Sequence, residues 1–180
     1  MTSSTPLHPP RASRDPLLRI TLVILRVAQI ICALAFALVV VFFLVSFVKP
    51  AFFEHDLLTG SFGSTPLGVV ITGVAGAGGM LLSLLLVGYL IKIAQSVGDG
   101  TPFIAENADR LQKVAYLSVG LLVTDTIMTG VAYFSTGRTR AEIDWSSLDP
   151  TKIITILALF ILARVFQEGV RLNDEAQFTV

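Results

Sequence analysis

One acidic residue, Asp125, lies near the middle of a stretch that is otherwise uncharged, from residue 114 to residue 137. On a helix, Ser118, Thr129 and Tyr133 would share a stripe with this carboxyl group and define one polar face. A lone charge at the centre of a membrane costs at least about 2.5–3.5 kcal/mol, so such a side chain faces protein or a water-filled cavity. Two hypotheses compete: Asp125 is a proton or ion site of a small transporter, or it is a structural group with a hydrogen-bonding partner.

Arg164 is the expected partner of Asp125, and the two residues form a candidate buried polar pair. Their estimated depths differ by a few ångströms at about 1.5 Å of helical rise per residue, which a long arginine side chain can bridge. Alternatively, Arg164 pairs with Glu168 one turn on, and a protonated Asp125 bonds to Thr129. A transport site normally has more convergent polar groups, broken helices or inverted repeats, and the sequence shows none of these. We favour the structural interpretation and keep transport as the alternative.

The other residues that could act in catalysis or ligand binding do not form clusters in the sequence. Cys32 is the only cysteine, which excludes an internal disulfide and a cysteine-based metal site. His8 and His55 suggest no ligand set. The glycines between residues 67 and 91 do not indicate phosphate binding, because no strand precedes them and no Lys-Ser or Lys-Thr pair follows. We expect no enzymatic activity, no cofactor and no bound metal.

Composition indicates a membrane protein. The chain is 53% hydrophobic and 14% charged, whereas soluble domains carry about 25% charged residues. The uncharged runs 27–48 and 67–91, and the run that holds Asp125, each reach the length of about 20 residues that a transmembrane helix needs. A fourth run, 153–163, is short, but the helical pattern continues beyond it as an amphipathic extension with one charged stripe. That stripe contains Arg164, Gln167, Glu168, Arg171 and Glu175.

The predicted fold is all-α: an integral membrane bundle of four transmembrane helices, at about residues 25–48, 67–94, 113–136 and 149–170. Residues 1–18 are rich in Pro, Ser and Thr and are expected to be a disordered N-terminus, which leaves 19–180 as the transmembrane domain. A cleaved signal peptide is the rival interpretation of the first run, but its apolar region would be shorter and would precede a small-residue cleavage site.

Charge asymmetry predicts the orientation of the helices. Lysine and arginine are twice as frequent in the segments on the N-terminal side of the membrane as on the other side. The positive-inside rule then predicts that both termini are cytoplasmic, with Tyr89 and Tyr116 near the inner interface. The net charge is zero, so direct nucleic-acid binding is not expected.

Small residues recur at every fourth position of the second predicted helix. This spacing lets membrane helices approach closely. We favour packing within the chain over a homodimer face, and a homo-oligomer stays open. The two sets are Gly68, Thr72 and Gly76, and Ala75, Gly79 and Ser83.

The segment between the second and third predicted helices is longer and more elaborate than a simple connection. Gly98 and Gly100 are expected to end one helix, and Thr101 with Pro102 to begin the next. Phe103 would then be an apolar residue at the membrane surface. The first turn of the new helix would hold Glu106 and Asp109, where negative charge suits the helix dipole.

This loop and the amphipathic tail, residues 164–180, are expected to pack on each other and form one cytoplasmic face. Phe103 would pack against Phe166 or Leu172, and the acids of the loop would meet Arg171. The alternative is that each segment lies on the lipid independently. The candidate face contains Pro102, Phe103, Glu106, Asn107, Arg110, Phe166, Glu168, Gly169, Arg171 and Leu172.

Two motifs, "PFIAENADRL" and "VFQEGVRLNDEAQFTV", resemble those of a bacterial four-span membrane family of unknown function, number 2975 in the domain-of-unknown-function series. Ile104 and Ala105 stand where that family often has Ser or Thr and then Pro, so Thr101 is expected to replace the usual helix cap. The matching positions are Pro102, Phe103, Glu106, Asn107, Arg110, Leu111, Phe166, Glu168, Gly169, Leu172, Glu175, Thr179 and Val180.

The resemblance implies a multi-pass protein of the bacterial plasma (inner) membrane. It also implies a protein partner at the cytoplasmic face, a small helix-turn-helix regulator, whose gene often lies beside those of the family. We therefore expect a non-enzymatic regulatory or interaction protein that is embedded in the lipid bilayer and works through its cytoplasmic face. A small transporter or channel subunit that uses Asp125 is the alternative.

Overall fold

The computed structural model describes residues 16–48, 66–136 and 149–177, and all regular secondary structure in these ranges is α-helical. The four helices are α1 (Pro16–Val48), α3 (Pro66–Gly98), α4 (Ala105–Thr136) and α5 (Pro150–Gln177). Each is long and apolar enough to cross a membrane. The predicted all-α fold with four such helices is confirmed, and it indicates a multi-pass membrane protein. Of the predicted disordered segment 1–18, residues 1–15 lie outside the described ranges, and Pro16 already begins α1.

Three of these helices begin at a proline, namely Pro16, Pro66 and Pro150. Proline suits the first helical position because its backbone has no N–H to leave unbonded and its φ angle is already helical. α5 has an additional cap, since the Asp149 carboxylate accepts a hydrogen bond from the backbone N–H of Thr151 at 2.8 Å. The start of the fourth predicted helix is therefore set by local chemistry.

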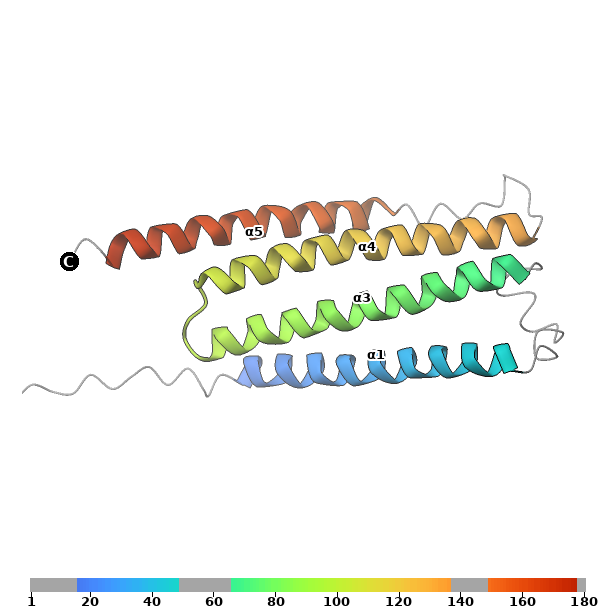
Figure 1. The fold of residues 1–180 in the computed structure, drawn as a ribbon. Helices are drawn as coiled ribbons and strands as arrows, with labels where there is room; N and C mark the ends of the chain where they lie inside the picture. The colour runs from blue at the N-terminus through green and yellow to red at the C-terminus, as the bar shows by residue number, and fades with distance from the viewer. Residues whose placement is uncertain (1–15, 49–65, 137–148, 178–180) are drawn as a thin grey trace, which may run out of the picture.

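The helices pack in chain order, α1 on α3, α3 on α4 and α4 on α5. Figure 1 shows the resulting row, with α1 and α5 at opposite edges. The four helices therefore form a row and not a closed bundle, because the edge helices α1 and α5 do not pack extensively against each other.

Glycines of α3 allow its neighbours to approach closely on both sides. A Cβ atom at Gly79 would lie 3.1 Å from Cγ2 of Thr124 in α4. A Cβ atom at Gly73 would overlap the ring of Phe43 in α1. Small residues of α3 thus serve packing within the chain, as the spacing predicted for Gly79.

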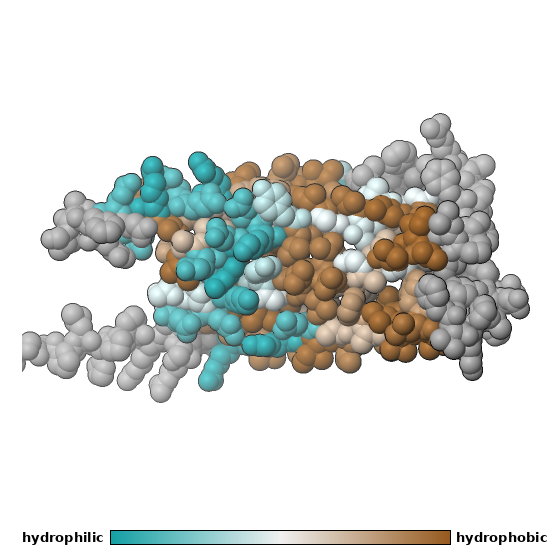
Figure 2. All heavy atoms as spheres, in the orientation of Figure 1, coloured by the Kyte–Doolittle hydropathy of each residue, from teal (hydrophilic) through white to brown (hydrophobic). Residues whose placement is uncertain are grey.

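The best-buried part of the molecule lies at the end where α3 and α4 connect. Most large apolar side chains elsewhere on the helices are exposed, as expected for surfaces in contact with lipid. Figure 2 shows hydrophilic residues gathered at the connected end and hydrophobic residues over the remainder. In Figure 1, α5 extends past the α3–α4 connection. The buried residues near this end are Ile91, Ser96, Asn107, Ala108, Leu111, Val114, Ala115 and Ala163.

Candidate functional site

The α3–α4 connection is a tight turn that α3 itself closes. The backbone N–H of Thr101 donates to the carbonyl of Ser96 at 3.1 Å, and Gly100 has a φ of 77°. This left-handed conformation is accessible to glycine at little cost, which explains the residue at this position. The prediction that Gly98 and Gly100 end the helix is confirmed, because α3 ends at Gly98.

The predicted start of the next helix was wrong. α4 begins at Ala105, not at Thr101 and Pro102. The carbonyl of Ile104 accepts the first backbone hydrogen bond, from Asn107 at 3.0 Å. The Thr101 hydroxyl is turned back to the end of α3, where it donates to the Ser96 carbonyl at 3.4 Å, so it is not available to cap α4.

Asn107 joins the two helices and the turn. Its side-chain nitrogen donates to the Ser96 hydroxyl at 2.5 Å and to the Pro102 carbonyl at 3.0 Å. Its side-chain oxygen accepts from Arg110 at 2.8 Å. The residue is 0% exposed, so although the motif placed Asn107 on the candidate face, it lies beneath that face and fixes its shape.

The loop packs on the tail through aromatic contacts. The rings of Phe103 and Phe166 have centroids 5.5 Å apart, so the predicted contact between these residues is present. A Cβ atom at Gly169 would lie 3.2 Å from Cδ1 of Phe103, so this glycine makes room for the ring. Further along α4, the side-chain nitrogen of Gln167 in α5 donates to the side-chain oxygen of Gln112 at 3.3 Å. The loop and α5 therefore form one packed unit.

The predicted ion pairs across this unit are not formed. Arg171 instead pairs within α5, with Glu168 at 2.5 Å and Glu175 at 3.8 Å. Neighbours one turn apart on a helix reach each other with little loss of side-chain freedom, which explains the preference over the acids of the loop. Leu172 is 55% exposed.

We call the outward part of this unit the loop–tail face. It consists of Phe103, Glu106, Phe166, Glu168, Gly169, Arg171 and Leu172.

The candidate pair Asp125–Arg164 is replaced by another pair. The Asp125 carboxylate bonds to Lys152 at 2.5 Å, whereas Arg164 donates to Gln167 at 3.4 Å. The edge-to-face contact of Tyr116 with Phe160, at 5.3 Å between ring centroids, fixes the register of α4 and α5. Because Arg164 lies about 18 Å further along α5 than Lys152, at 1.5 Å per residue, it cannot reach Asp125 in this register.

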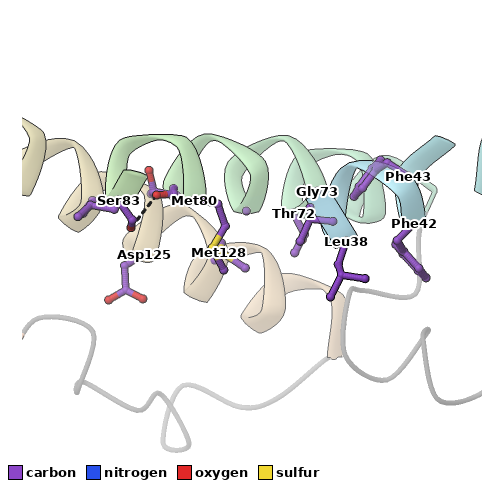
Figure 3. Close-up of a pocket in the computed structure, with 14 residues that line it drawn as sticks. Leu38, Phe42, Phe43, Thr72, Gly73, Met80, Ser83, Asp125 and Met128 are labelled. Carbon is purple, nitrogen blue, oxygen red and sulfur yellow. Dashed lines mark hydrogen bonds between the residues drawn. The ribbon is translucent and has the colours of Figure 1, made fainter. Parts of the chain in front are cut away.

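Asp125 lines two cavities on different sides of α4. One cavity, of about 510 Å³, lies between α1, α3 and α4 and is mostly apolar. Figure 3 shows Asp125 near one end of this lining, with Phe42 and Phe43 at the other end. The second cavity, of about 490 Å³, lies between α4 and α5. Its polar lining contains Ser118, Asp125, Asp149, Thr151, Lys152 and Thr155.

The structure also brings together residues that no motif marked. Lys152 is one of them, and its position near the start of α5 could have suggested a partner for an acid in α4. Lys92 and Lys113 both lie over the ring of Tyr89, with the nitrogens 5.8 Å and 5.7 Å from its centroid. Among the described residues, no group of three or more His, Cys, Asp or Glu side chains could hold a metal ion.

No protein-family model, curated protein or solved structure matches the chain.

Proposed function

We propose that this chain is a non-enzymatic regulatory or interaction protein of a membrane, and that its working surface is the loop–tail face. The observation that carries the proposal is the packing of Phe103 on Phe166 and over Gly169. A connection between two helices needs no such contact with a third. Here the contact joins the loop and α5 into a surface of defined shape.

The burial pattern supports a rigid platform at this end. Asn107, Val114 and Ala115 are nearly inaccessible beneath the face, although the greater part of each helix exposes its apolar side chains. Functional surfaces are most precise where a packed scaffold holds them. The face itself presents exposed apolar groups, Phe103 at 49% and Leu172 at 55%, among charged side chains. This combination suits recognition of a protein partner.

The membrane and the partner belong to the same proposal. The excess of lysine and arginine around the loop and the N-terminus supports a cytoplasmic location for the face. The motif resemblance supports a bacterial plasma membrane and a small helix-turn-helix regulator as the partner. In this arrangement the membrane protein binds the regulator and makes no contact with nucleic acid.

Site-specific photocrosslinking in native membranes tests the proposal. A photoreactive residue at Leu172 should give a discrete protein adduct, whereas the same residue at Val41, an exposed apolar position on α1, should give none. Phe103→Ala should abolish the adduct at Leu172 while the protein remains in the membrane, because it removes the ring that holds the loop on α5. Equal adducts at Leu172 and Val41, or an adduct indifferent to Phe103→Ala, would contradict the proposal.

The Asp125–Lys152 pair favours a second candidate, a small transporter or channel subunit. Both side chains are partly exposed, at 46% and 44%, and Asp125 lines cavities on two sides of α4. A proton or ion site needs a cavity beside the acid, and these two cavities would supply it. Reconstitution into liposomes tests this candidate: a pH-dependent flux that disappears in Asp125→Asn would establish it, and no flux in the wild type would remove it.

A further inference from the structure

Two lysines from different helices converge on one tyrosine. Lys92 follows Tyr89 by one turn on α3, and Lys113 reaches the same ring from α4. Since each nitrogen is less than 6 Å from the ring centroid, the two ammonium groups lie within about 12 Å of each other. The face of the ring attracts both cations. Both positive charges therefore lie around one tyrosine ring.

Neither lysine has its charge neutralised within the part of the chain that the structure describes. The ion pairs formed there involve Asp125, Glu168 and Glu175, and none includes Lys92 or Lys113. Both lysines are exposed. Two ammonium groups without ion-pair partners, brought from separate helices to one ring, give this place the positive charge that attracts an anion.

The depth of the site identifies the kind of anion. Lys92 directly follows the uncharged run of α3, and Lys113 directly precedes that of α4. Figure 2 shows the hydrophilic end giving way to the hydrophobic part of the helices. In a bilayer this boundary is the level of the lipid headgroups, where tyrosine is also enriched. A third cation, Arg26, directly precedes the uncharged run of α1, and the nearby contact of Gln29 with Gly88 places it at a similar level.

We propose that Lys92 and Lys113, held by the ring of Tyr89, bind the phosphate of an anionic phospholipid headgroup, whose acyl chains lie along the apolar surfaces of α3 and α4. Basic pockets between transmembrane helices bind phosphorylated headgroups in this way. The lysines supply the charge, and the tyrosine ring holds them in position. The site is separate from the loop–tail face and does not depend on the function proposed for it.

Native mass spectrometry of the full-length protein tests the site. The protein is released from mixed micelles with equal amounts of phosphatidylglycerol and phosphatidylcholine, and the retained lipids are counted. The wild type should prefer phosphatidylglycerol. Lys92→Gln and Lys113→Gln should each weaken this preference about five-fold, and the double variant about thirty-fold, as expected for single charges near an anionic headgroup. Tyr89→Phe should keep the preference, because the ring remains.

Arg171→Gln is the matched control. It also removes one positive charge, but from a guanidinium already paired with Glu168, so the preference should be unchanged. If the double lysine variant retains as much phosphatidylglycerol as Arg171→Gln, the proposal is wrong. Competition with millimolar inorganic phosphate separates the two sources of the anion. Phosphate should leave the bound lipid in place, and full displacement would overturn the assignment to a lipid.

Discussion

Replacement of Asn107 by alanine should loosen the whole connected end of the molecule. The change removes hydrogen bonds to the Ser96 hydroxyl, to the Pro102 carbonyl and from Arg110. Each such bond contributes about 0.5–1.5 kcal/mol, and a buried group left without a partner costs about 1–3 kcal/mol. Arg110 is partly exposed and can turn to water, so its bond counts for little. The expected loss of stability is about 2–3 kcal/mol.

A thiol-reactive fluorophore measures this loss, because Cys32 is the only cysteine and is partly buried on α1. For a chain of this size, about 1 kcal/mol corresponds to about 2–4 °C, so Asn107→Ala should lower Tm in detergent by about 5–10 °C. Asn107→Asp has nearly the same volume but loses the N–H donors, so it should not restore Tm. Glu106→Ala, an exposed change one residue away, should alter stability by less than about 0.5 kcal/mol. If Asn107→Ala and Glu106→Ala unfold at the same temperature, the three-way contact does not hold the turn.

Three further predictions concern other parts of the chain. Gly73→Ala should lower Tm, because the new methyl group displaces the ring of Phe43, at a cost in stability of about 1–3 kcal/mol. Gly78→Ala is the control: a Cβ atom there has no neighbouring atom within 4 Å, so Tm should stay equal or rise. Lys152→Gln should lower Tm more than Asp125→Asn, because it leaves a carboxylate unpaired within a membrane-spanning helix, and the double variant should cost less than Lys152→Gln alone in a thermal double-mutant cycle. Hydrogen bonds from the side chain and then the backbone of Thr151 lower the pKa of Asp149 below its usual 3.8. The stabilisation by the Asp149 carboxylate is therefore fully present above pH 3.8 and is lost as pH falls through the lowered pKa. Acid titration of helicity should therefore differ between the wild type and Asp149→Ala above about pH 4 and converge at lower pH.

The sequence predicted the helices well because three of them have a long run with at most one charged residue and three begin at a proline. It also predicted that Phe103 meets Phe166, since both residues leave the apolar region at the same level. It missed the partner of Asp125, because the register of two helices depends on side-chain packing such as that of Tyr116 on Phe160. The order of charged and polar residues along the chain does not determine this register.

The turn illustrates a second limit of sequence patterns. Thr101 and Pro102 have the residue types of a helix start, but the Thr101 hydroxyl bonds backwards to Ser96. Asn107 matched a motif associated with a functional loop, yet it is buried beneath the loop. In both cases a polar side chain had more than one satisfactory partner, and only the three-dimensional arrangement selected one.

The edge helix α5 makes two contacts with the rest of the molecule that lie far apart along its length. Its extensive packing is with α4 alone. The same helix carries Lys152, which holds Asp125, and Phe166, which supports Phe103, about 21 Å further along at 1.5 Å per residue. A slide of α5 by one turn would shift both contacts by the same 5.4 Å or so. Any movement of α5 along α4 would therefore alter the ion pair and the loop–tail face together.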